Sequence, residues 1–389
     1  MTFQIRTLNA ISPIGLGRLP ADRYRVGHDI DDPDALLVRS ASLHGEMIPA
    51  SVLAVARAGA GTNNIPIAEY SARGIPVFNT PGANANAVKE LVVAGIFLAA
   101  RNIVDAAAFA HRLEGDHATM DRLVETGKKS YVGFELPGRT LGVIGLGAIG
   151  VEVANVAVSL GMKVLGYDPA VTVEHAWALS SSVEHVRSLD QLLRRSDIVT
   201  VHVPLVDGTR GLIGAEEFAA MKTSAVLLNF ARGPIVDEPS LIAALDGGQL
   251  RGYVCDFPTP LLNKRPHVVT LPHLGASTKE AEENCAVMAA DALRAYLEEG
   301  TVRNSVNFPN AALPRTESRR RLAIANANVP NMVGQISTMV GEAGLNIGDL
   351  LNSSRGELAY TLVDVDGEIP DSLVAAIAAL DGVLSARVI

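Results

Sequence analysis

Short apolar runs alternate with helix-compatible stretches along most of the chain. Between residues 141 and 271 this alternation is regular. Apolar runs separated by helical stretches are typical of parallel strands whose sheet is covered by helices on both faces. The pattern predicts an α/β fold with a Rossmann-type, doubly wound parallel sheet in the middle of the chain. We expect its strands at 141–144, 163–167, 198–203, 225–229, 252–256 and 268–271.

Two further regions have patterns of their own. The first ninety residues contain apolar runs at 35–39, 52–56 and 75–78, which predict a smaller parallel sheet. Helical segments are expected from 87 to about 111 and from 278 to 299. The last seventy residues follow a βαββαβ pattern, typical of a ferredoxin-like module.

A glycine-rich turn is the strongest motif of the chain. Gly145, Gly147 and Gly150 stand between the first central strand and a helical stretch, and Asp168 ends the next strand. The first glycine permits the tight turn, the second lets backbone approach a pyrophosphate, and the third lets the helix pack closely. The helix N-terminus at Ala148 and Ile149 favours an anion. The spacing therefore predicts a dinucleotide site.

Asp168 also indicates which dinucleotide binds. A carboxylate there accepts hydrogen bonds from a ribose 2′-hydroxyl and repels a 2′-phosphate. The residues that follow, Pro169-Ala170-Val171, include no Arg or Lys to neutralise a phosphate. NAD is therefore expected in preference to NADP.

Charge and composition exclude several partners. The net charge of −9 over 389 residues argues against nucleic acid or an anionic membrane surface. The longest apolar run, 91–100, is half the length of a membrane span and predicts a buried helix. Cys255 and Cys285 are the only cysteines, so we expect a cytoplasmic protein without a disulfide framework. No signal peptide and no metal site are expected.

Two side chains that follow central strands have the chemistry needed for hydride transfer from an alcohol. Hydride transfer from an alcohol needs a base for the hydroxyl proton and a cation for the substrate's carboxylate. Arg232 follows the strand at 225–229, and His273 follows the strand at 268–271. Imidazole is the usual proton shuttle near neutral pH.

Five further segments have recognisable motifs, and they are 57–64, 79–90, 202–205, 229–233 and 271–275. Together with the glycine turn, these segments resemble the D-2-hydroxyacid dehydrogenase family, and the resemblance covers almost the whole chain. The resemblance implies a discontinuous, flavodoxin-like substrate domain beside the nucleotide domain, and a homo-oligomer, dimer or tetramer. Within the family, the chain is most similar to members that oxidise D-3-phosphoglycerate in the first step of L-serine biosynthesis.

The resemblance also implies roles for single residues. Arg232 would clamp the substrate's carboxylate and carbonyl, and His273 would act as general acid and base. Arg39 and Arg57 would bind the phosphate, and backbone near Asn84 would touch the substrate. The cofactor would further contact His202, Val203, Pro204, Phe230, Ala231, Asp256, His273 and Gly275.

One family position is missing. The family usually has an Asp facing the cofactor and, a few residues later, a Glu that hydrogen-bonds the histidine. Between Val254 and His273 this chain has only one carboxylate, Asp256. Asp256 is therefore expected either to partner His273 as a catalytic residue or to face the nicotinamide, or another segment supplies the partner.

The C-terminal module resembles an ACT domain, a small-molecule sensor that often pairs with a second copy. The resemblance implies L-serine as a possible effector, with Asn328 and Asn346 as its contacts. Asn326 stands where relatives have a His, so the alternative is a module kept only for assembly.

The expected organisation follows from these points. The substrate domain is predicted at 1–95 and 275–303, the NAD-binding domain at 96–274, a linker at 304–318 and the ACT domain at 319–389, with a cleft and a hinge between the first two. Two alternatives to the phosphoglycerate activity remain open. One is an NAD-dependent dehydrogenase for another D-2-hydroxy acid, and the other is an NAD-sensing binding protein without turnover.

Overall fold

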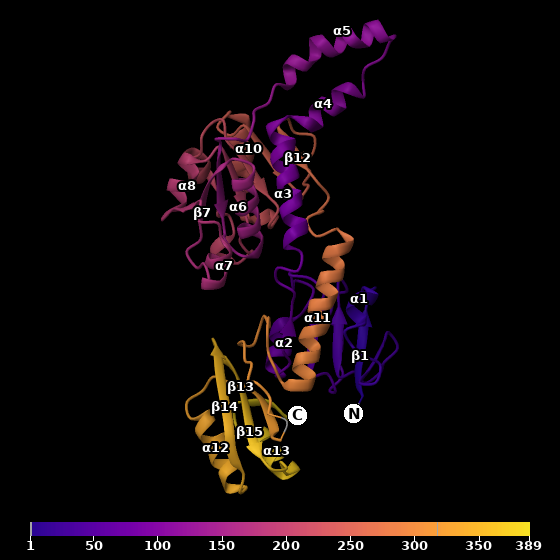
Figure 1. The fold of residues 1–389 in the computed structure, drawn as a ribbon, viewed down its shortest axis with the longest axis vertical. Helices are drawn as coiled ribbons and strands as arrows, with labels where there is room; N and C mark the ends of the chain where they lie inside the picture. The colour runs from indigo at the N-terminus through magenta and orange to yellow at the C-terminus, as the bar shows by residue number, and fades with distance from the viewer. Residues whose placement is uncertain (1, 317) are drawn as a thin grey trace. The chain divides into compact units, whose positions relative to one another are not determined.

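The chain folds into two compact units, drawn in Figure 1. The computed structural model describes residues 2–316 and 318–389. One unit is Ala85–Thr278, and the other combines Met1–Asn84 with Lys279–Ile389. The C-terminal module therefore shares a compact unit with the N-terminal sheet, whereas the sequence pattern suggested a unit of its own.

The central unit contains a seven-stranded parallel sheet in the order β12-β11-β10-β9-β6-β7-β8. Every position of β9, β10 and β11 is buried, because helices cover both faces. The strand order reverses between β6 and β9, and ligands of such sheets bind beyond the carboxyl ends of the strands at this point. The predicted doubly wound sheet is confirmed. Its strands are β6 (Thr140–Ile144), β7 (Lys163–Tyr167), β8 (Val183–His185), β9 (Ile198–Val201), β10 (Val226–Asn229), β11 (Gly252–Cys255) and β12 (Val268–Thr270).

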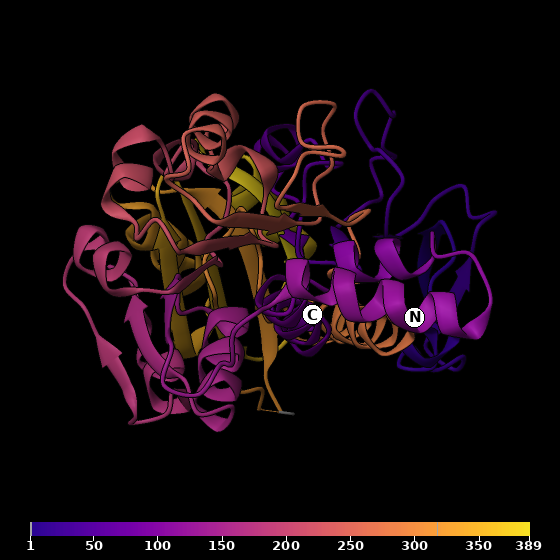
Figure 2. The same cartoon turned by 90° about the horizontal axis from the view of Figure 1, so that it is seen from above.

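Most helices of this unit pack on the sheet, but two extend away from it. Helices α4 and α5 project as an arm (Figure 1), seen from above in Figure 2, and neither has a buried residue. Among the described residues, no single helix is long and apolar enough to cross a membrane, and α3 and α4 meet that test only as a pair bent by 65°. The helices are α3 (Ala85–Ala100), α4 (Ile103–Ala110), α5 (His117–Gly127), α6 (Ala148–Ser159), α7 (Val173–Ala178), α8 (Leu189–Arg195), α9 (Ala215–Ala220) and α10 (Glu238–Asp246).

The single helix expected from 87 to about 111 was wrong in one respect, because the chain breaks at Asn102. This residue has a left-handed backbone with φ 50°, which an asparagine tolerates better than most residues. Its side-chain amide donates to the carbonyl oxygen of Val132 at 3.2 Å. A contact thirty residues away therefore fixes a bend that the continuous apolar composition does not indicate.

The N-terminal part of the other unit is a five-stranded parallel sheet in the order β2-β1-β3-β4-β5. This is the flavodoxin-like order. Helix α11 packs closely on α1, since a Cβ placed on Gly15 would lie 2.4 Å from the Cβ of Ala286. The strands are β1 (Phe3–Leu8), β2 (Tyr24–Gly27), β3 (Ala35–Val38), β4 (Ala54–Arg57) and β5 (Val77–Phe78), and the helices are α1 (Pro13–Leu16), α2 (Ile67–Ala72) and α11 (Lys279–Glu299).

The C-terminal module has the expected βαββαβ order. Its four strands form an antiparallel sheet in the order β14-β15-β13-β16. One face buries Leu322, Ile324 and Val363 with residues of both helices in one apolar cluster. The elements are β13 (Arg320–Ala327), α12 (Met332–Glu342), β14 (Asn346–Arg355), β15 (Leu358–Asp366), α13 (Asp371–Ala378) and β16 (Val383–Val388).

The opposite face of this small sheet packs on the N-terminal part of the unit. Ala323, Tyr360 and Leu362 belong to the same apolar cluster as Phe78 and Tyr296. The predicted linker also contributes to this core, since Phe308 is fully buried and Ala311 nearly so. We call residues 302–311 the strap, because the chain pairs with itself at Val302 and Ala311.

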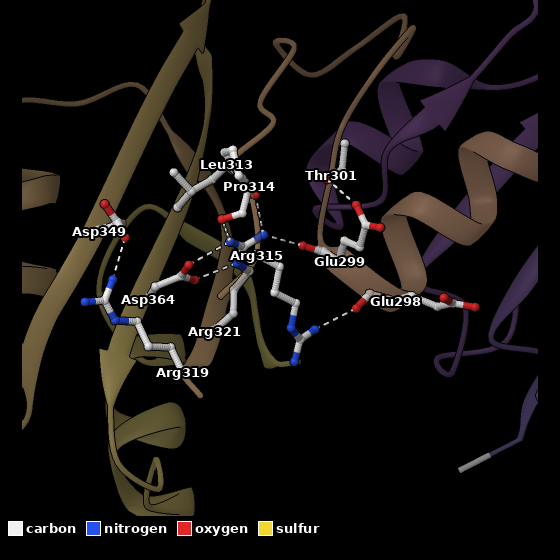
Figure 3. A network of polar contacts seen from close by, with 10 residues as sticks. All are labelled: Glu298, Glu299, Thr301, Leu313, Pro314, Arg315, Arg319, Arg321, Asp349 and Asp364. Carbon is white, nitrogen blue, oxygen red and sulfur yellow. Dashed lines mark hydrogen bonds and ion pairs between the residues drawn. The ribbon is translucent and has the colours of Figure 1, made fainter. Parts of the chain in front are cut away.

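A buried ion pair joins the module to helix α11 (Figure 3). Arg321 is 0 % exposed, and its Nε and Nη2 donate to the two carboxylate oxygens of Asp364 at 2.6 and 2.7 Å. Its Nη1 donates to the carbonyl oxygens of Glu299 at 2.8 Å and Leu313 at 2.9 Å, and Nη2 also to that of Pro314 at 3.2 Å. The guanidinium group is therefore fully hydrogen-bonded at the junction of three segments.

Candidate active site

The glycine turn lies at the carboxyl end of β6, where the strand order reverses. Gly145 has φ 92°, and a Cβ there would lie 2.7 Å from the carbonyl oxygen of His202. A Cβ on Gly150 would lie 1.9 Å from the carbonyl oxygen of Gly145, so the helix can approach the turn only with glycine there. By contrast, a Cβ on Gly147 would meet nothing within 4 Å.

Next to Gly147, backbone N–H groups at the start of α6 are available to a ligand. Gly147 is the N-cap of α6, and no side chain caps this helix end. The free N–H groups at Ala148 and Ile149 and the helix dipole favour a phosphate. The turn therefore fits the pyrophosphate of a dinucleotide.

Asp168 follows β7, the neighbouring strand, and is held by the same turn. One carboxylate oxygen accepts the backbone N–H of Leu146 at 2.8 Å, and the other accepts that of Ala170 at 2.8 Å. Each oxygen retains acceptor capacity. A fixed carboxylate beside the glycine turn is the arrangement that the ribose hydroxyls of NAD require.

His202 forms the wall of the site after β9. Its backbone N–H donates to the carbonyl oxygen of Ile144 at 2.7 Å, and its Nε2 lies 2.9 Å from the hydroxyl of Thr200. Burial lowers the pKa of His202 to about 3. The ring is therefore neutral at physiological pH and positions backbone rather than carrying charge. Val203 and Pro204 continue this loop, and Phe230 and Ala231 follow β10.

The guanidinium group of Arg232 is available to bind an anion. It is exposed, and the one hydrogen bond of its guanidinium group to the described residues is Nη1 to the neighbouring carbonyl oxygen of Ala231, at 2.6 Å. Its backbone is held by Asn229, whose amide donates to the Arg232 carbonyl oxygen at 2.9 Å. The backbone is thus fixed, while most guanidinium N–H groups have no acceptor among the described residues.

Asp256 and His273 lie together beyond β11 and β12. The backbone N–H of His273 donates to the carbonyl oxygen of Asp256 at 3.0 Å, and that of Gly275 donates to the Asp256 Oδ2 at 3.1 Å. His273 has φ 51°, and its ring lies 5.2 Å from that of Phe257. Asp256 thus holds the backbone on both sides of the histidine loop.

The Asp256 carboxylate is the unusual group of the site. It is 1 % exposed, and its Oδ1 has no hydrogen-bond partner among the described residues. Burial raises the pKa of Asp256, while the Gly275 N–H and the nearby His273 and Arg232 lower it. Within residues 85–278, the described contacts include no hydrogen bond between a carboxylate and the His273 ring, so the partner of this ring stays a prediction.

Arg39 and Arg57 lie at the carboxyl edge of the N-terminal sheet. Arg57 ends β4 and pairs in register with Val38, the residue before Arg39. Burial raises the pKa of the Cys285 thiol on α11, and a hydrogen bond with Thr80 and the charges of both guanidinium groups oppose this rise. Arg39 forms a short ion pair with Glu282. Asn84 ends the loop that follows β5, and its buried Oδ1 has no partner among the described residues.

The two asparagines assigned to an effector lie at opposite ends of β14. The Asn328 amide donates to the carbonyl oxygen of Gly356 at 3.0 Å, and the Asn346 amide donates to Asp366 at 3.0 Å. At 3.3 Å per residue, the ten-residue strand separates them by about 30 Å. One module therefore does not bring them together. Asn326, at the position of the family's His, is buried and accepts from the hydroxyl of Thr361 at 3.2 Å.

Two ion pairs of the structure were missed at the level of sequence. Glu282 is the partner of Arg39, and it comes from a helix more than two hundred residues away. The buried Arg321–Asp364 pair joins residues 43 positions apart. The one signal in the sequence that could have drawn attention to Arg321 is its charge within an apolar strand pattern.

Comparison with known proteins gives one coherent result. The NAD-binding domain model of the D-isomer specific 2-hydroxyacid dehydrogenases matches residues 95–275. D-3-phosphoglycerate dehydrogenase of Haemophilus influenzae is 35 % identical over 362 residues, covering 89 % of this chain and 84 % of that protein. The enzyme of the same name from Dictyostelium discoideum is 32 % identical and covers 100 % of this chain and 92 % of its own.

Solved structures agree. The apo form of D-mandelate dehydrogenase from Rhodotorula graminis superposes with a TM-score of 0.68 at 26 % identity, covering 81 % of this chain and all of that one. NAD⁺-bound 3-phosphoglycerate dehydrogenase from Entamoeba histolytica gives a TM-score of 0.63 at 26 % identity, covering 79 % of this chain and 99 % of that one.

Proposed function

The chain belongs to the D-isomer specific 2-hydroxyacid dehydrogenase family, and we propose that it oxidises D-3-phosphoglycerate to 3-phosphohydroxypyruvate with NAD⁺, the first step of L-serine biosynthesis. One observation carries the proposal. Arg232, Asp256 and His273 follow three adjacent strands, β10, β11 and β12, of the sheet that also bears the glycine turn. The carboxyl ends of adjacent parallel strands form one edge, so these groups serve one bound molecule.

Each residue has a step in the oxidation. The guanidinium group of Arg232 binds the substrate's carboxylate, for which a planar fork is better suited than an ammonium group. His273 accepts the proton of the 2-hydroxyl group as the carbonyl forms. The glycine turn and Asp168 would hold NAD⁺, which would supply the acceptor for the hydride of C2.

Asp256 is assigned to the histidine loop and the cofactor. Its Oδ2 and its carbonyl oxygen hold Gly275 and His273, which leaves Oδ1 for a donor of the ligand. Two roles follow from the sequence and are separable by experiment. If Asp256 stabilises imidazolium, Asp256→Asn shifts the pH–rate profile. If it binds the nicotinamide amide, the same change raises the KM for NAD⁺ and leaves the profile unchanged.

Arg39 and Arg57 are assigned to the substrate's phosphate, and backbone near Asn84 is assigned to a contact with the substrate. They are the cationic groups after β3 and at the end of β4. The ion pair of Arg39 with Glu282 must open or be shared when a phosphate binds.

The deciding experiment compares 2-oxo acids in the reverse direction. NADH oxidation is followed with 3-phosphohydroxypyruvate, 2-oxoglutarate and pyruvate. The proposal expects kcat/KM to be at least about tenfold higher for the phosphorylated acid, because the phosphate contacts add binding in the transition state. Equal values would favour the other dehydrogenases of the family, and no turnover with any would favour an NAD-sensing binding protein.

A homo-oligomer, dimer or tetramer, is part of the proposal. The arm formed by α4 and α5 exposes Ile103, Val104 and Val124, each more than 40 % accessible, and projects from its own sheet. Such a surface suits a second copy. Val104→Glu should lower the mass measured by light scattering to that of a smaller species, and the same mass would remove this arm from the interface.

L-serine is proposed as effector at a junction of two modules, and the cytoplasm as the site of action. Asn328 of one copy would meet Asn346 of a second, since one module holds them about 30 Å apart along β14. Millimolar serine should then reduce turnover, and Asn346→Ala should abolish the response without changing the uninhibited rate. A retained response would reject this site. Both cysteines are free and buried, in keeping with a reducing compartment.

A further inference from the structure

A polar cavity lies between the C-terminal module and the N-terminal part of the same unit. It has a volume of about 760 Å³. Three segments form its walls. They are the loop after β5, the strap and the end of β14, represented by Asn79 and Pro81, Asn304 and Asn310, and Ser353 and Arg355. None of these segments contributes to the NAD site, and the cavity has no role in the hydride transfer described above.

The chemistry of the lining favours an anion. Among the described residues that line the cavity, none is acidic, and Arg355 is the one cation. Its Nη1 donates to the carbonyl oxygen of Ser305 at 3.0 Å, and its remaining guanidinium N–H groups have no acceptor among the described residues. Amide and hydroxyl groups of the other walls supply donors around it. A guanidinium group held on one side and open on the other is suited to a carboxylate or phosphate.

The walls are held in place before any ligand binds. The Asn79 N–H donates to the Asn304 carbonyl oxygen at 3.2 Å, and the Asn304 N–H donates to the Asn310 Oδ1 at 3.1 Å. Phe78 and Ser305 form an isolated bridge between β5 and the strap. The hydroxyl of Ser305 is bonded to Asn307 at 2.9 Å, which fixes the turn beneath the cavity. A preformed site saves the cost of ordering these groups on binding.

We propose that this cavity binds a small metabolite through a carboxylate or phosphate group held by Arg355, and that binding acts on the loop 79–84. Asn79 and Pro81 line the cavity, and Asn84, the proposed substrate contact, ends the same loop. A ligand that binds better to one arrangement of this loop shifts its population and thereby the affinity for substrate. The binding claim stands without the proposed function, and only the kinetic effect rests on it.

Calorimetric titration of the full chain tests the binding claim. Inorganic phosphate and succinate serve as probes at constant ionic strength, and all proteins carry Arg57→Gln to weaken phosphate binding at the proposed substrate site. Arg355→Gln should weaken binding of the probes about tenfold or more, because a charge-assisted bond is lost. Arg25→Gln, which changes an exposed arginine on β2, is the matched control and should bind as the parent does.

A second variant guards against a folding artefact. Asn310→Asp keeps the acceptor for the Asn304 N–H but brings a negative charge into the cavity, so it should also lose the anion. If only succinate or only phosphate binds, that result names the ligand class. No binding to the parent at millimolar probe, or equal binding to the Arg355→Gln and Arg25→Gln proteins, overturns the proposal. Measured without turnover, neither result depends on the outcome of the 2-oxo acid comparison.

Discussion

Two arginines show how differently this chain uses the same side chain. Arg321 is completely buried, and its guanidinium group donates to Asp364 and three carbonyl oxygens. Arg232 is exposed, and within the described residues its guanidinium group donates only to the neighbouring carbonyl oxygen of Ala231. Both stand at the border of an apolar strand, so composition and local pattern do not separate them.

The difference lies in where the unsatisfied hydrogen-bonding capacity remains. A buried charge is tolerated only when its partners are complete, and removing one partner then costs several kcal/mol. A charge left incomplete but anchored through its backbone is available to a ligand. The same contrast holds for carboxylates. Both oxygens of Asp364 are bonded, whereas Oδ1 of the buried Asp256 has no partner among the described residues. Groups with unused hydrogen-bonding capacity therefore lie at the carboxyl edge of the large sheet, where we expect the reaction. The fully bonded Arg321–Asp364 pair lies where the C-terminal module meets helix α11.

The largest expected effect is on turnover, when one of the proposed catalytic residues is replaced. His273→Asn should lower kcat roughly 100- to 10,000-fold, the usual contribution of a positioned acid or base. Asparagine is chosen because the backbone at this position is left-handed. Arg232→Lys should also be severe, since an ammonium group cannot reproduce the planar fork. Neither change should move the melting temperature by more than about 2 °C, because few protein contacts are lost. His267→Asn, at another exposed left-handed histidine, should retain full turnover in the same steady-state assay.

Changes to the buried Arg321–Asp364 pair should lower stability rather than turnover. Arg321→Met leaves Asp364 buried without its partner, which should reduce the free energy of unfolding by roughly 3–5 kcal/mol. Chemical denaturation measures this loss. The double change Arg321→Met with Asp364→Leu should recover much of it, because no charge is then left unpaired. If the single variant is as stable as the wild type, the pair does not hold the module in place.

The next prediction concerns the Asp168 carboxylate and the choice between NADH and NADPH. Asp168→Ala should reduce the preference for NADH over NADPH by about tenfold or more, because the repulsion of a 2′-phosphate is removed. The ratio of kcat/KM for the two cofactors measures it. Asp190→Ala, on the exposed face of α8, is the control and should leave the ratio unchanged. A native preference for NADPH would reject the role of Asp168.

The last expected effect concerns pH. Burial lowers the pKa of His202 to about 3 from 6.5, so the unfolded chain binds this proton first as the pH falls. Stability from His202 is therefore present above pH 6.5 and is lost below it, by up to about 1.4 kcal/mol per pH unit. His202→Asn should flatten the plot of unfolding free energy against pH between 6.5 and 4. An unchanged slope would mean that the ring is protonated in the native state, and His185→Gln, exposed on β8, provides the reference slope.

Local patterns and distant contacts explain what could be predicted from the sequence. The glycine turn, its flanking strands and Asp168 lie within thirty residues, so one segment fixes their geometry, and the doubly wound sheet was predicted. The break at Asn102, the partner of Arg39 and the Arg321–Asp364 pair depend on contacts between segments far apart. Nothing in the local pattern encodes these contacts. The environment of Asp256 likewise depends on the turn at Gly275, which brings an N–H to its carboxylate.

The most direct test of the central claim is the oxidation of D-3-phosphoglycerate itself. NAD⁺ reduction is measured with D-3-phosphoglycerate and with D-glycerate, for the wild type and for Arg57→Gln. The account predicts a kcat/KM at least about tenfold higher for the phosphorylated acid. The loss in Arg57→Gln should be confined to that substrate, because Arg57 is assigned to the phosphate that D-glycerate lacks. Equal kcat/KM for the two acids in the wild type would contradict the assignment of a phosphorylated substrate.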